Sequence, residues 1–439
     1  AAGADRLSSA DAWTSLVSRA VDEAVDLVLL AGDVVDRFNR SFEAYGPLQQ
    51  GIRSLKAAGI PVVAVAGNHD YDSLPDVAAE VGEGHLAVLG RGGAWERWTL
   101  RGENGAARLH VDGWSFPDQH WRDDPTAGYD PAALGAPGGV PGSVPGGVPG
   151  SAPGDVPVLG LVHGDLDQPG SRYGPLATSR LRSFDVAAWV LGHIHTPMLR
   201  EEPGSPAILY PGSVQALDAG ERGPHGAWIL ELEGGRRPVF RPVALSGVRY
   251  DRIDVDVDGV DDAAALNAAV RQSLQQHVDR LGEESVGPLK VVYCQVRLTG
   301  HTRLHGDIEA ALDGLGALEI PHDAGFRLLA DPRPLVDTRP ALDLAALSKG
   351  SDAPALLARL LLALDGDGEG AGRPDGLAAL PDGLAGLASQ AADAAAGSTH
   401  YVSAGLDPLD LSPGSRRLGD GLRRQAARLL DALMTQSVA

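Results

Sequence analysis

Stretches of continuous apolar sequence alternate with stretches of helical periodicity near the start of the chain, and this alternation limits the fold more than any other feature. The apolar runs are VDLVLLAG at 25–32 and IPVVAVAG at 60–67, and helical patterns precede them at 5–24 and 41–59. A strand that is buried on both faces has such a continuous apolar sequence, and helices that alternate with it cross over a parallel sheet. The sequence therefore predicts an α/β fold.

Two later apolar runs, VPVLGLVHG at 156–164 and DVAAWVLGH at 185–193, predict further strands of the same kind. Ligands of parallel sheets bind at the carboxyl ends of the strands. We therefore expect the residues that follow these four strands to meet at one edge of a single sheet.

Residue types that bind metal ions follow each of the four predicted strands. The motifs are GDVVD, GNHD, VHGD and GHIH, and their candidate site residues are Asp33, Asp36, Asn68, His69, His163, His193 and His195. Each motif alone has an ordinary structural explanation, since aspartate and asparagine cap helices and turns and a histidine can be satisfied in a core. The occurrence of all four together favours a shared cation site.

The ligand types indicate the kind of cation and the kind of chemistry. Mixed Asp, Asn and His ligands suit manganese, iron or zinc better than calcium, which prefers oxygen ligands. A carboxylate such as Asp33 can bridge two cations, and metal ions about 3.5–4 Å apart stabilise the attacking and leaving oxygens of a phosphoester displacement. His69 is then predicted to protonate the leaving oxygen as the catalytic acid, and Asp36 is predicted to orient its imidazole.

In this order, the four motifs resemble the signature of the calcineurin-like metallophosphoesterases over residues 25–215. The resemblance implies a β-sandwich core flanked by helices and a two-metal site. By motif position, Asp33 is the bridging ligand and His195 serves one metal ion. The ligands that complete the other metal ion are Asn68, His163 and His193.

Later segments resemble one branch of this superfamily. ILYPGSVQALDAGERG at 208–223 is similar to a segment of DNA-repair nuclease subunits of the SbcCD type, and 248–330 with its GHTRLH stretch at 300–305 is similar to their capping domain. The resemblance implies a manganese-dependent exo- and endonuclease that acts on double-stranded DNA ends, with Mg²⁺, Fe or Zn as alternative metals. It also implies an SbcC-like coiled-coil ATPase as partner and a homodimer.

One motif of the superfamily has no counterpart in this sequence. Its members open with an apolar strand that ends in Asp-x-His, but no histidine precedes Asp33 here. We expect the chain to begin downstream of this motif and to have weak or no nuclease activity as given, because one metal ion would keep only Asp33 and His195 as ligands. Two alternatives stay open: a phosphomonoesterase or cyclic-nucleotide phosphodiesterase, and a non-catalytic scaffold that binds DNA or an ATPase.

The domain organisation follows from the same patterns. Residues 1–247 are predicted to form the phosphoesterase domain, with a flexible Pro/Gly-rich insertion at 135–157 and a closing hairpin formed by GAWILELEGG and RRPVFRPVAL. A small α+β capping domain is expected at 248–330. A helical region at 331–439 follows, with a mobile Ala/Gly/Asp-rich segment at 362–398.

The C-terminal tail from Arg416 onwards has a leucine-rich helical face, and its arginines lie largely elsewhere on the helix. Such a helix could dock on a partner's coiled coil or on DNA phosphates. It could equally pack its leucines on its own domain.

Composition excludes several classes of protein. The formal net charge of −21, with only three lysines, argues against a polyanion binder that acts through overall charge. The one cysteine, Cys294, lies in the apolar run VVYCQV, so neither disulfides nor a thiolate zinc cluster are expected. No apolar run approaches the about 20 residues that span a bilayer, and no signal peptide opens the sequence. We therefore expect a cytoplasmic protein with no membrane partner.

Overall fold

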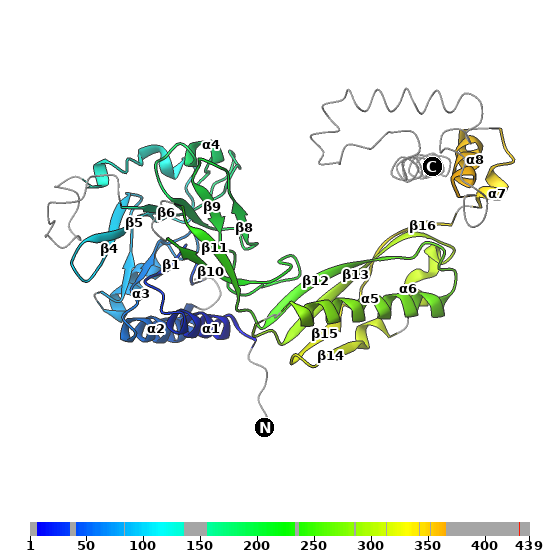
Figure 1. The fold of residues 1–439 in the computed structure, drawn as a ribbon, viewed down its shortest axis with the longest axis horizontal. Coiled ribbons are helices and arrows are strands. Elements are labelled where there is room, and N and C mark those ends of the chain that lie inside the picture. Colours follow the sequence, from blue (N-terminus) through cyan, green and yellow to red (C-terminus); the bar gives the residue numbers. More distant parts are fainter. Residues whose placement is uncertain are drawn as a thin grey trace. The chain divides into compact units, whose positions relative to one another are not determined.

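The computed structural model describes most of the chain up to residue 365 (Figure 1). The described residues are 7–35, 41–82, 84–135, 156–232, 237–284, 287–312, 314–341, 343–351, 353–365 and Leu430. They fall into two compact units. Unit 1 comprises Ala1–Val257, Asp262–Thr299 and Asp307–Asp337, and unit 2 comprises Asp258–Asp261, Gly300–Gly306 and Thr338–Ala439.

A three-stranded parallel sheet and three helices form the first layers of unit 1. The sheet has the order β1 (Val28–Leu30), β2 (Val62–Ala64), β3 (Leu86–Val88), and the helices are α1 (Ser9–Asp22), α2 (Ser41–Ala57) and α3 (Ser73–Val81). These elements confirm the helix and strand alternation predicted for the first 70 residues. Helix α1 begins with a capping box in which the side chains of Ser8 and Asp11 bond each other's backbone amides.

A second, six-stranded sheet follows in the chain. Its order is β4 (Glu96–Arg101), β5 (Ala107–Trp114), β6 (Val158–His163), β7 (Ala188–Gly192), β9 (Ala207–Tyr210), β8 (Met198–Arg200). Strands β5, β6, β7 and β9 run parallel, and the edge strands β4 and β8 pair antiparallel to their neighbours. Two short helical elements, η2 (Pro125–Gly128) and α4 (Thr178–Leu181), lie in its connections.

Alternate side chains of β2 show how the two sheets pack. Val62 and Ala64 belong to an apolar cluster with the residues of α1, α2 and α3. Val63 belongs to a second cluster, together with Val111 and Leu161 of the six-stranded sheet. Because successive side chains of a strand point to opposite faces, the three-stranded sheet lies between the helices and the second sheet.

The expectation that all four motif strands share one sheet is therefore wrong. Strands β1 and β2 belong to one sheet, and β6 and β7 belong to the other. A strand that is covered by a second sheet is as apolar as one that is covered by helices, so the sequence pattern does not distinguish the two arrangements. The β-sandwich flanked by helices that the family resemblance implies is confirmed.

A β-hairpin and most of a second α+β part complete unit 1, and the last residues of two strands of this part belong to unit 2. The predicted hairpin is present as β10 (Gly226–Glu231) and β11 (Val239–Ala244). The remaining sheet has the order β12 (Val248–Asp256), β13 (Val291–Thr302), β15 (Phe326–Ala330), β14 (Glu319–His322), and β16 (Leu335–Pro340) also pairs with β13. The predicted boundary of this domain at residue 330 stays a prediction.

Helix α5 (Ala263–Glu283) covers one face of this sheet (Figure 1). It begins at the N-cap Asp262, whose side chain accepts a hydrogen bond from the amide of Ala265. The helix buries Leu266, Leu274 and Leu281. Cys294 of β13 is also buried, as expected for a core cysteine.

The short helical elements near the end of the described chain are η4 (His305–Asp307), α6 (Ile308–Ala311), η5 (Leu315–Ala317), α7 (Leu344–Leu347) and α8 (Ala353–Asp365). In unit 2, Leu361 of α8 forms an apolar cluster with Leu430. No helix among the described residues is long and apolar enough to cross a membrane.

Several sequence predictions concern residues outside the described ranges. They are the catalytic role of Asp36, the insertion at 135–157 apart from its first and last residues, the segment at 362–398 apart from its first four residues, and the arginine-bearing helix from Arg416 apart from Leu430. These predictions stay untested.

Candidate metal centre

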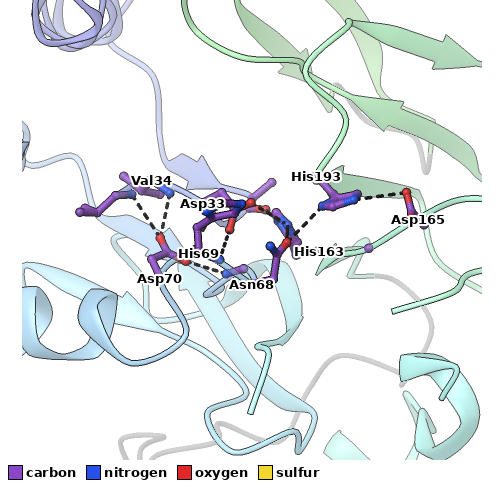
Figure 2. Close-up of polar contacts among 12 residues, drawn as sticks. Asp33, Val34, Asn68, His69, Asp70, His163, Asp165 and His193 are labelled. Carbon is purple, nitrogen blue, oxygen red and sulfur yellow. Dashed lines mark hydrogen bonds and ion pairs between the residues drawn. The ribbon is translucent and has the colours of Figure 1, made fainter. Parts of the chain in front are cut away.

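Four of the predicted site residues meet where the two sheets of the sandwich come together. Asp33 follows β1 and Asn68 follows β2, whereas His163 ends β6 and His193 follows β7. One ligand atom of each of Asp33, His163 and His193 lies within 4.8 Å of the other two. Figure 2 shows His163 between Asp33 and His193, with Asn68 beside it. The sandwich thus brings both sheets' motifs to one site.

Asp33 carries the negative charge at the centre of this cluster. Its Oδ2 atom lies 3.1 Å from Nε2 of His163, and its Oδ1 atom accepts a hydrogen bond of 2.8 Å from the amide of His69. Burial opposes ionisation, but the charge of His163 and the hydrogen bonds from His163 and His69 outweigh it and lower the pKa of Asp33 to about 2. Asp33 is therefore an anion at neutral pH, as its predicted role of bridging ligand requires.

Asn68 joins the two histidines. Its Oδ1 atom lies 3.1 Å from Nε2 of His163 and 3.2 Å from Nδ1 of His193, and its side chain is buried. An amide oxygen in this position supplies a third kind of ligand atom to the same space.

A backbone carbonyl group fixes the orientation of the His163 ring. Its Nδ1 atom lies 2.9 Å from the carbonyl oxygen of Ala31, so Nδ1 donates its proton there and Nε2 faces Asp33 and Asn68. Burial lowers the pKa of His163, but the charge and hydrogen bond of Asp33 outweigh it, so the net shift is upward. The raised pKa and the hydrogen-bond acceptors at both ring nitrogens favour the doubly protonated ring in the absence of a cation, and a bound cation would replace the proton on Nε2.

His193 has a similar arrangement. Its Nδ1 atom faces Asn68, and its Nε2 atom lies 3.4 Å from Oδ1 of Asp165. The ring of Tyr173 packs against the imidazole with the ring centroids 5.1 Å apart. Burial and the positive charge of His163 lower the pKa of His193, which favours the neutral form that binds metal ions.

The backbone at two of these candidate ligands is strained. Asp33 has a φ of 53° and His193 a φ of 100°, in the left-handed region that side chains other than glycine seldom adopt. Such conformations cost about 1–3 kcal/mol each and concentrate at functional sites. The surrounding structure therefore maintains both ligands in positions that the isolated chain disfavours.

Glycines allow the loops to approach the His163 ring closely. A Cβ atom on Gly67 would lie 2.2 Å from Oδ1 of Asp33, and one on Gly192 would lie 1.8 Å from the carbonyl oxygen of Ala31 and 2.5 Å from Nδ1 of His163. Gly67 directly precedes Asn68, and Gly192 directly precedes His193. No larger residue fits at either position without displacing a ligand.

Asp70 supports the centre, although it was not among the candidate site residues and its predicted alternative was to stabilise a turn. Its fully buried carboxylate accepts hydrogen bonds from the amides of Gly67 at 2.7 Å, Val34 at 2.8 Å and Asp33 at 3.2 Å. It therefore ties the loop after β1 to the loop after β2. Burial and the nearby charge of Asp33 raise the pKa of Asp70 to about 6. The signal was present in the sequence as the last residue of GNHD.

His195 does not belong to the cluster of mutually close ligand atoms. Its Nδ1 atom lies 2.5 Å from Oε1 of Glu221, and the side chain is about half exposed. Glu221 also accepts hydrogen bonds from the amide of Leu217 and the hydroxyl of Ser213. Glu221 and Asp165 are thus two carboxylates that contact the predicted ligands His195 and His193. They were not predicted from the sequence, because no local spacing relates either carboxylate to the histidine that it contacts.

The predicted catalytic acid lies beside the cluster. The backbone amide of His69 bonds Asp33, as described above, and the residue follows Asn68 directly. The predicted role of its imidazole stays a prediction, as does the support expected from Asp36.

The donor set fits a transition-metal ion. One carboxylate, one amide oxygen and two imidazoles converge, and each imidazole is held at its other nitrogen by a carbonyl or a carboxylate. Metal-binding histidines characteristically have such outer partners. Manganese, iron and zinc accept these mixed ligands.

Comparisons with known proteins agree with this site. Residues 6–197 match the family of calcineurin-like phosphoesterases, and residues 250–318 match the middle domain of the metallophosphoesterase YhaO. Over 263 residues the chain is 28% identical to the uncharacterized metallophosphoesterase YhaO of Bacillus subtilis (strain 168). The aligned region covers 60% of this chain and 58% of that protein. The chain thus spans less than two thirds of the length of this relative.

Among solved structures, the chain is similar to TT1561 of Thermus thermophilus, with a TM-score of 0.31 and 14% sequence identity over 53% of this chain and 92% of that chain. The family match covers all four motifs that carry the candidate ligands up to His195. The comparisons therefore support a domain of the calcineurin-like metallophosphoesterase superfamily at residues 6–197.

Proposed function

We propose that this chain is a divalent-metal-dependent phosphodiesterase that acts on DNA. The observation that carries the proposal is the meeting of Asp33, Asn68, His163 and His193 from two different sheets at one point. Asp33 and His193 have strained backbone conformations in this arrangement, and Gly67 and Gly192 allow the loops to pack closely. Strained backbone of this kind concentrates at functional sites.

Each residue of the centre has a distinct part in the proposed reaction. Asp33, Asn68, His163 and His193 would hold the cation, for which we propose manganese. A bound divalent cation supplies Lewis-acid polarisation of the phosphoryl group and lowers the pKa of a water molecule. His69 lies next to the ligand Asn68, where its imidazole would donate a proton to the leaving oxygen.

The substrate and partners are part of the same proposal. The segment at 208–223 is similar to that of SbcCD-type nuclease subunits, which supports double-stranded DNA ends as substrate and an SbcC-like coiled-coil ATPase and a second copy of the chain as partners. The net charge of −21 means that DNA affinity would depend on the cation and on local arginines rather than on the surface as a whole.

Hydrolysis of linear duplex DNA in the presence of Mn²⁺ tests the proposal. We expect slow, metal-dependent release of nucleotides that EDTA and His163→Ala both abolish. The variant His85→Gln is the matched control, since His85 contacts Gly82 and Lys56 rather than the centre.

Two outcomes would contradict the proposal. Hydrolysis of p-nitrophenyl phosphate or of a cyclic nucleotide without hydrolysis of DNA would favour a small-molecule phosphoesterase. Metal binding and DNA binding without hydrolysis of any of these substrates would favour the non-catalytic scaffold.

A further inference from the structure

Strand β12 forms an edge of its sheet, and helix α5 packs against this sheet (Figure 1). A groove of about 420 Å³ is lined by residues of β12 and α5 and by Arg222. The polar side chains that line it include Arg222, Arg252, Asp254, Ser273, Gln276 and Arg280. The chain brings Arg222 to this edge because the amide of Gly223 donates a hydrogen bond of 2.9 Å to the carbonyl of Tyr250. Three arginines therefore gather in one groove of a chain whose formal net charge is −21.

The positive charge of the groove exceeds its negative charge. Asp254 is the carboxylate among the lining residues, and Arg297 already binds it through Nε at 2.8 Å and Nη2 at 2.5 Å. The charges of Arg252 and Arg222 contribute to the lowered pKa of Asp254, but within the described part of the chain neither arginine forms an ion pair of 4 Å or less. Their guanidinium groups therefore have hydrogen-bond donors available to an external ligand.

A buried network fixes the position of the third arginine. Nη2 of Arg280 lies 2.6 Å from Nδ1 of His277, and Nε2 of His277 lies 2.7 Å from Oδ2 of Asp251. Arginine can only donate, so Nδ1 of His277 accepts, and its Nε2 donates to Asp251. His277 and Asp251 are both more than nine-tenths buried. The network thus fixes the position of Arg280, which is exposed as a residue.

We propose that this groove binds a phosphate group through Arg222, Arg252 and Arg280. Guanidinium groups match the geometry of phosphate oxygens and bind them in pairs of hydrogen bonds. The hydroxyl of Ser273 and the amide of Gln276 add two uncharged donors at the same place. The phosphate belongs either to a small phosphorylated molecule or to a nucleic-acid backbone, and the site is separate from the metal-ligating residues.

Binding experiments with two probes test this site. Inorganic pyrophosphate represents the free anion, and a short fluorescent DNA duplex represents the phosphodiester backbone. EDTA is present throughout, so that the metal centre contributes nothing and failure here leaves the proposed hydrolase function untouched. We expect wild-type protein to bind at least one probe and Arg222→Gln/Arg252→Gln to weaken that binding about tenfold or more.

A matched control removes the same charge elsewhere. Arg53 lies in α2 and Arg271 in α5, both are exposed, and neither lines the groove. The variant Arg53→Gln/Arg271→Gln should keep wild-type affinity. For the duplex, the groove variant should also reduce the slope of log affinity against log salt by about 2, roughly one for each lost phosphate contact.

The results also identify the source of the phosphate. Weakening confined to pyrophosphate indicates a small phosphorylated ligand, and weakening confined to the duplex indicates a nucleic-acid backbone. The proposal is overturned if wild-type protein binds neither probe, if the groove variant binds as wild type, or if the control variant loses as much affinity. Circular dichroism and the melting temperature establish that each variant is folded.

Discussion

The Nε2 atom of His163 lies 3.1 Å from the Oδ2 atom of Asp33, and this contact joins the two sheets of the sandwich. His163 ends a strand of the six-stranded sheet, and Asp33 follows a strand of the three-stranded sheet. Anything that binds both side chains at once therefore also holds the two sheets together.

Replacement of His163 should abolish tight metal binding. The change His163→Ala removes one of the two imidazoles of the centre, so we expect the affinity for Mn²⁺ to fall about a hundredfold or more. Since a ligand present at about 100 times its Kd stabilises the native state by about 2.7 kcal/mol, Mn²⁺ should raise the Tm of wild-type protein but not of the variant. Calorimetric titration and thermal melts measure both effects. An equal Mn²⁺-dependent rise in Tm in the two proteins would contradict the assignment.

Added methyl groups at Gly67 and Gly192 should damage the centre by crowding. Gly67→Ala and Gly192→Ala place a Cβ within 2.2 Å and 1.8 Å of neighbouring oxygens, so one of the ligand loops must move. We expect each variant to lose Mn²⁺ affinity and about 1–3 kcal/mol of unfolding free energy. Isothermal titration and denaturant unfolding are the measurements.

The matched glycine control is Gly46→Ala within helix α2. A Cβ at Gly46 meets nothing within 4 Å. This variant should keep wild-type Mn²⁺ affinity. Unchanged Mn²⁺ affinity in Gly67→Ala and Gly192→Ala would show that the loops relax without cost.

Asp70→Asn should destabilise the loops that carry the ligands. The side-chain amide would turn an N–H₂ group towards backbone amides that now donate to a carboxylate oxygen, which leaves buried donors without acceptors. We expect a loss of about 1–3 kcal/mol in the free energy of unfolding, measured by urea denaturation. The exposed Asp76→Asn in α3 should change it by only a few tenths of a kcal/mol. Equal effects of the two substitutions would remove Asp70 from its assigned role.

Asp165 should act on metal binding through His193. Because its Oδ1 atom lies 3.4 Å from Nε2 of His193, the carboxylate orients the ring and increases its basicity. Asp165→Asn should weaken Mn²⁺ binding about 10-fold to about 100-fold without loss of the fold, and the exposed Asp118→Asn should not weaken it. Electron paramagnetic resonance of bound Mn²⁺ measures the affinities. If Asp165→Asn binds Mn²⁺ as tightly as wild type, His193 is oriented by other contacts.

Metal binding should tighten as the pH rises. Asp33 and the Ala31 carbonyl raise the pKa of His163 above its ordinary value, and coordination through Nε2 requires the ring to lose a proton. The affinity for Mn²⁺ should therefore increase up to this raised pKa and stay constant above it. Titrations from about pH 5.5 to about pH 8 cover the range in which histidine changes its charge.

The metal-free protein should show the opposite dependence. The contact of protonated His163 with Asp33 stabilises the fold fully below the ordinary pKa of histidine, and this contribution is lost as the pH rises through the raised pKa. Thermal melts in EDTA over the same range, with His163→Gln as control, measure this contribution. A Mn²⁺ affinity that does not vary with pH would contradict a protonated His163 in the free protein.

Much of the fold and most of the site could be predicted from local sequence patterns. The apolar runs placed β1, β2, β6 and β7, and helical periodicity placed α1 and α2, because the period of hydrophobicity along a segment reports its own conformation. The polar residues at the ends of these strands identified Asp33, Asn68, His163 and His193 as candidates, since the residue after a buried strand lies at the edge of its sheet.

The tertiary structure alone decided how these parts meet. It separated the motif strands into two sheets. It also brought Asp70 into hydrogen bonds with the loops after β1 and β2, Asp165 into contact with His193, and Glu221 into contact with His195. It also imposed the left-handed backbone of Asp33 and His193. Hydrophobic periodicity describes one segment at a time, whereas sheet membership and these contacts depend on segments that are distant along the chain, so only the packed molecule fixes them.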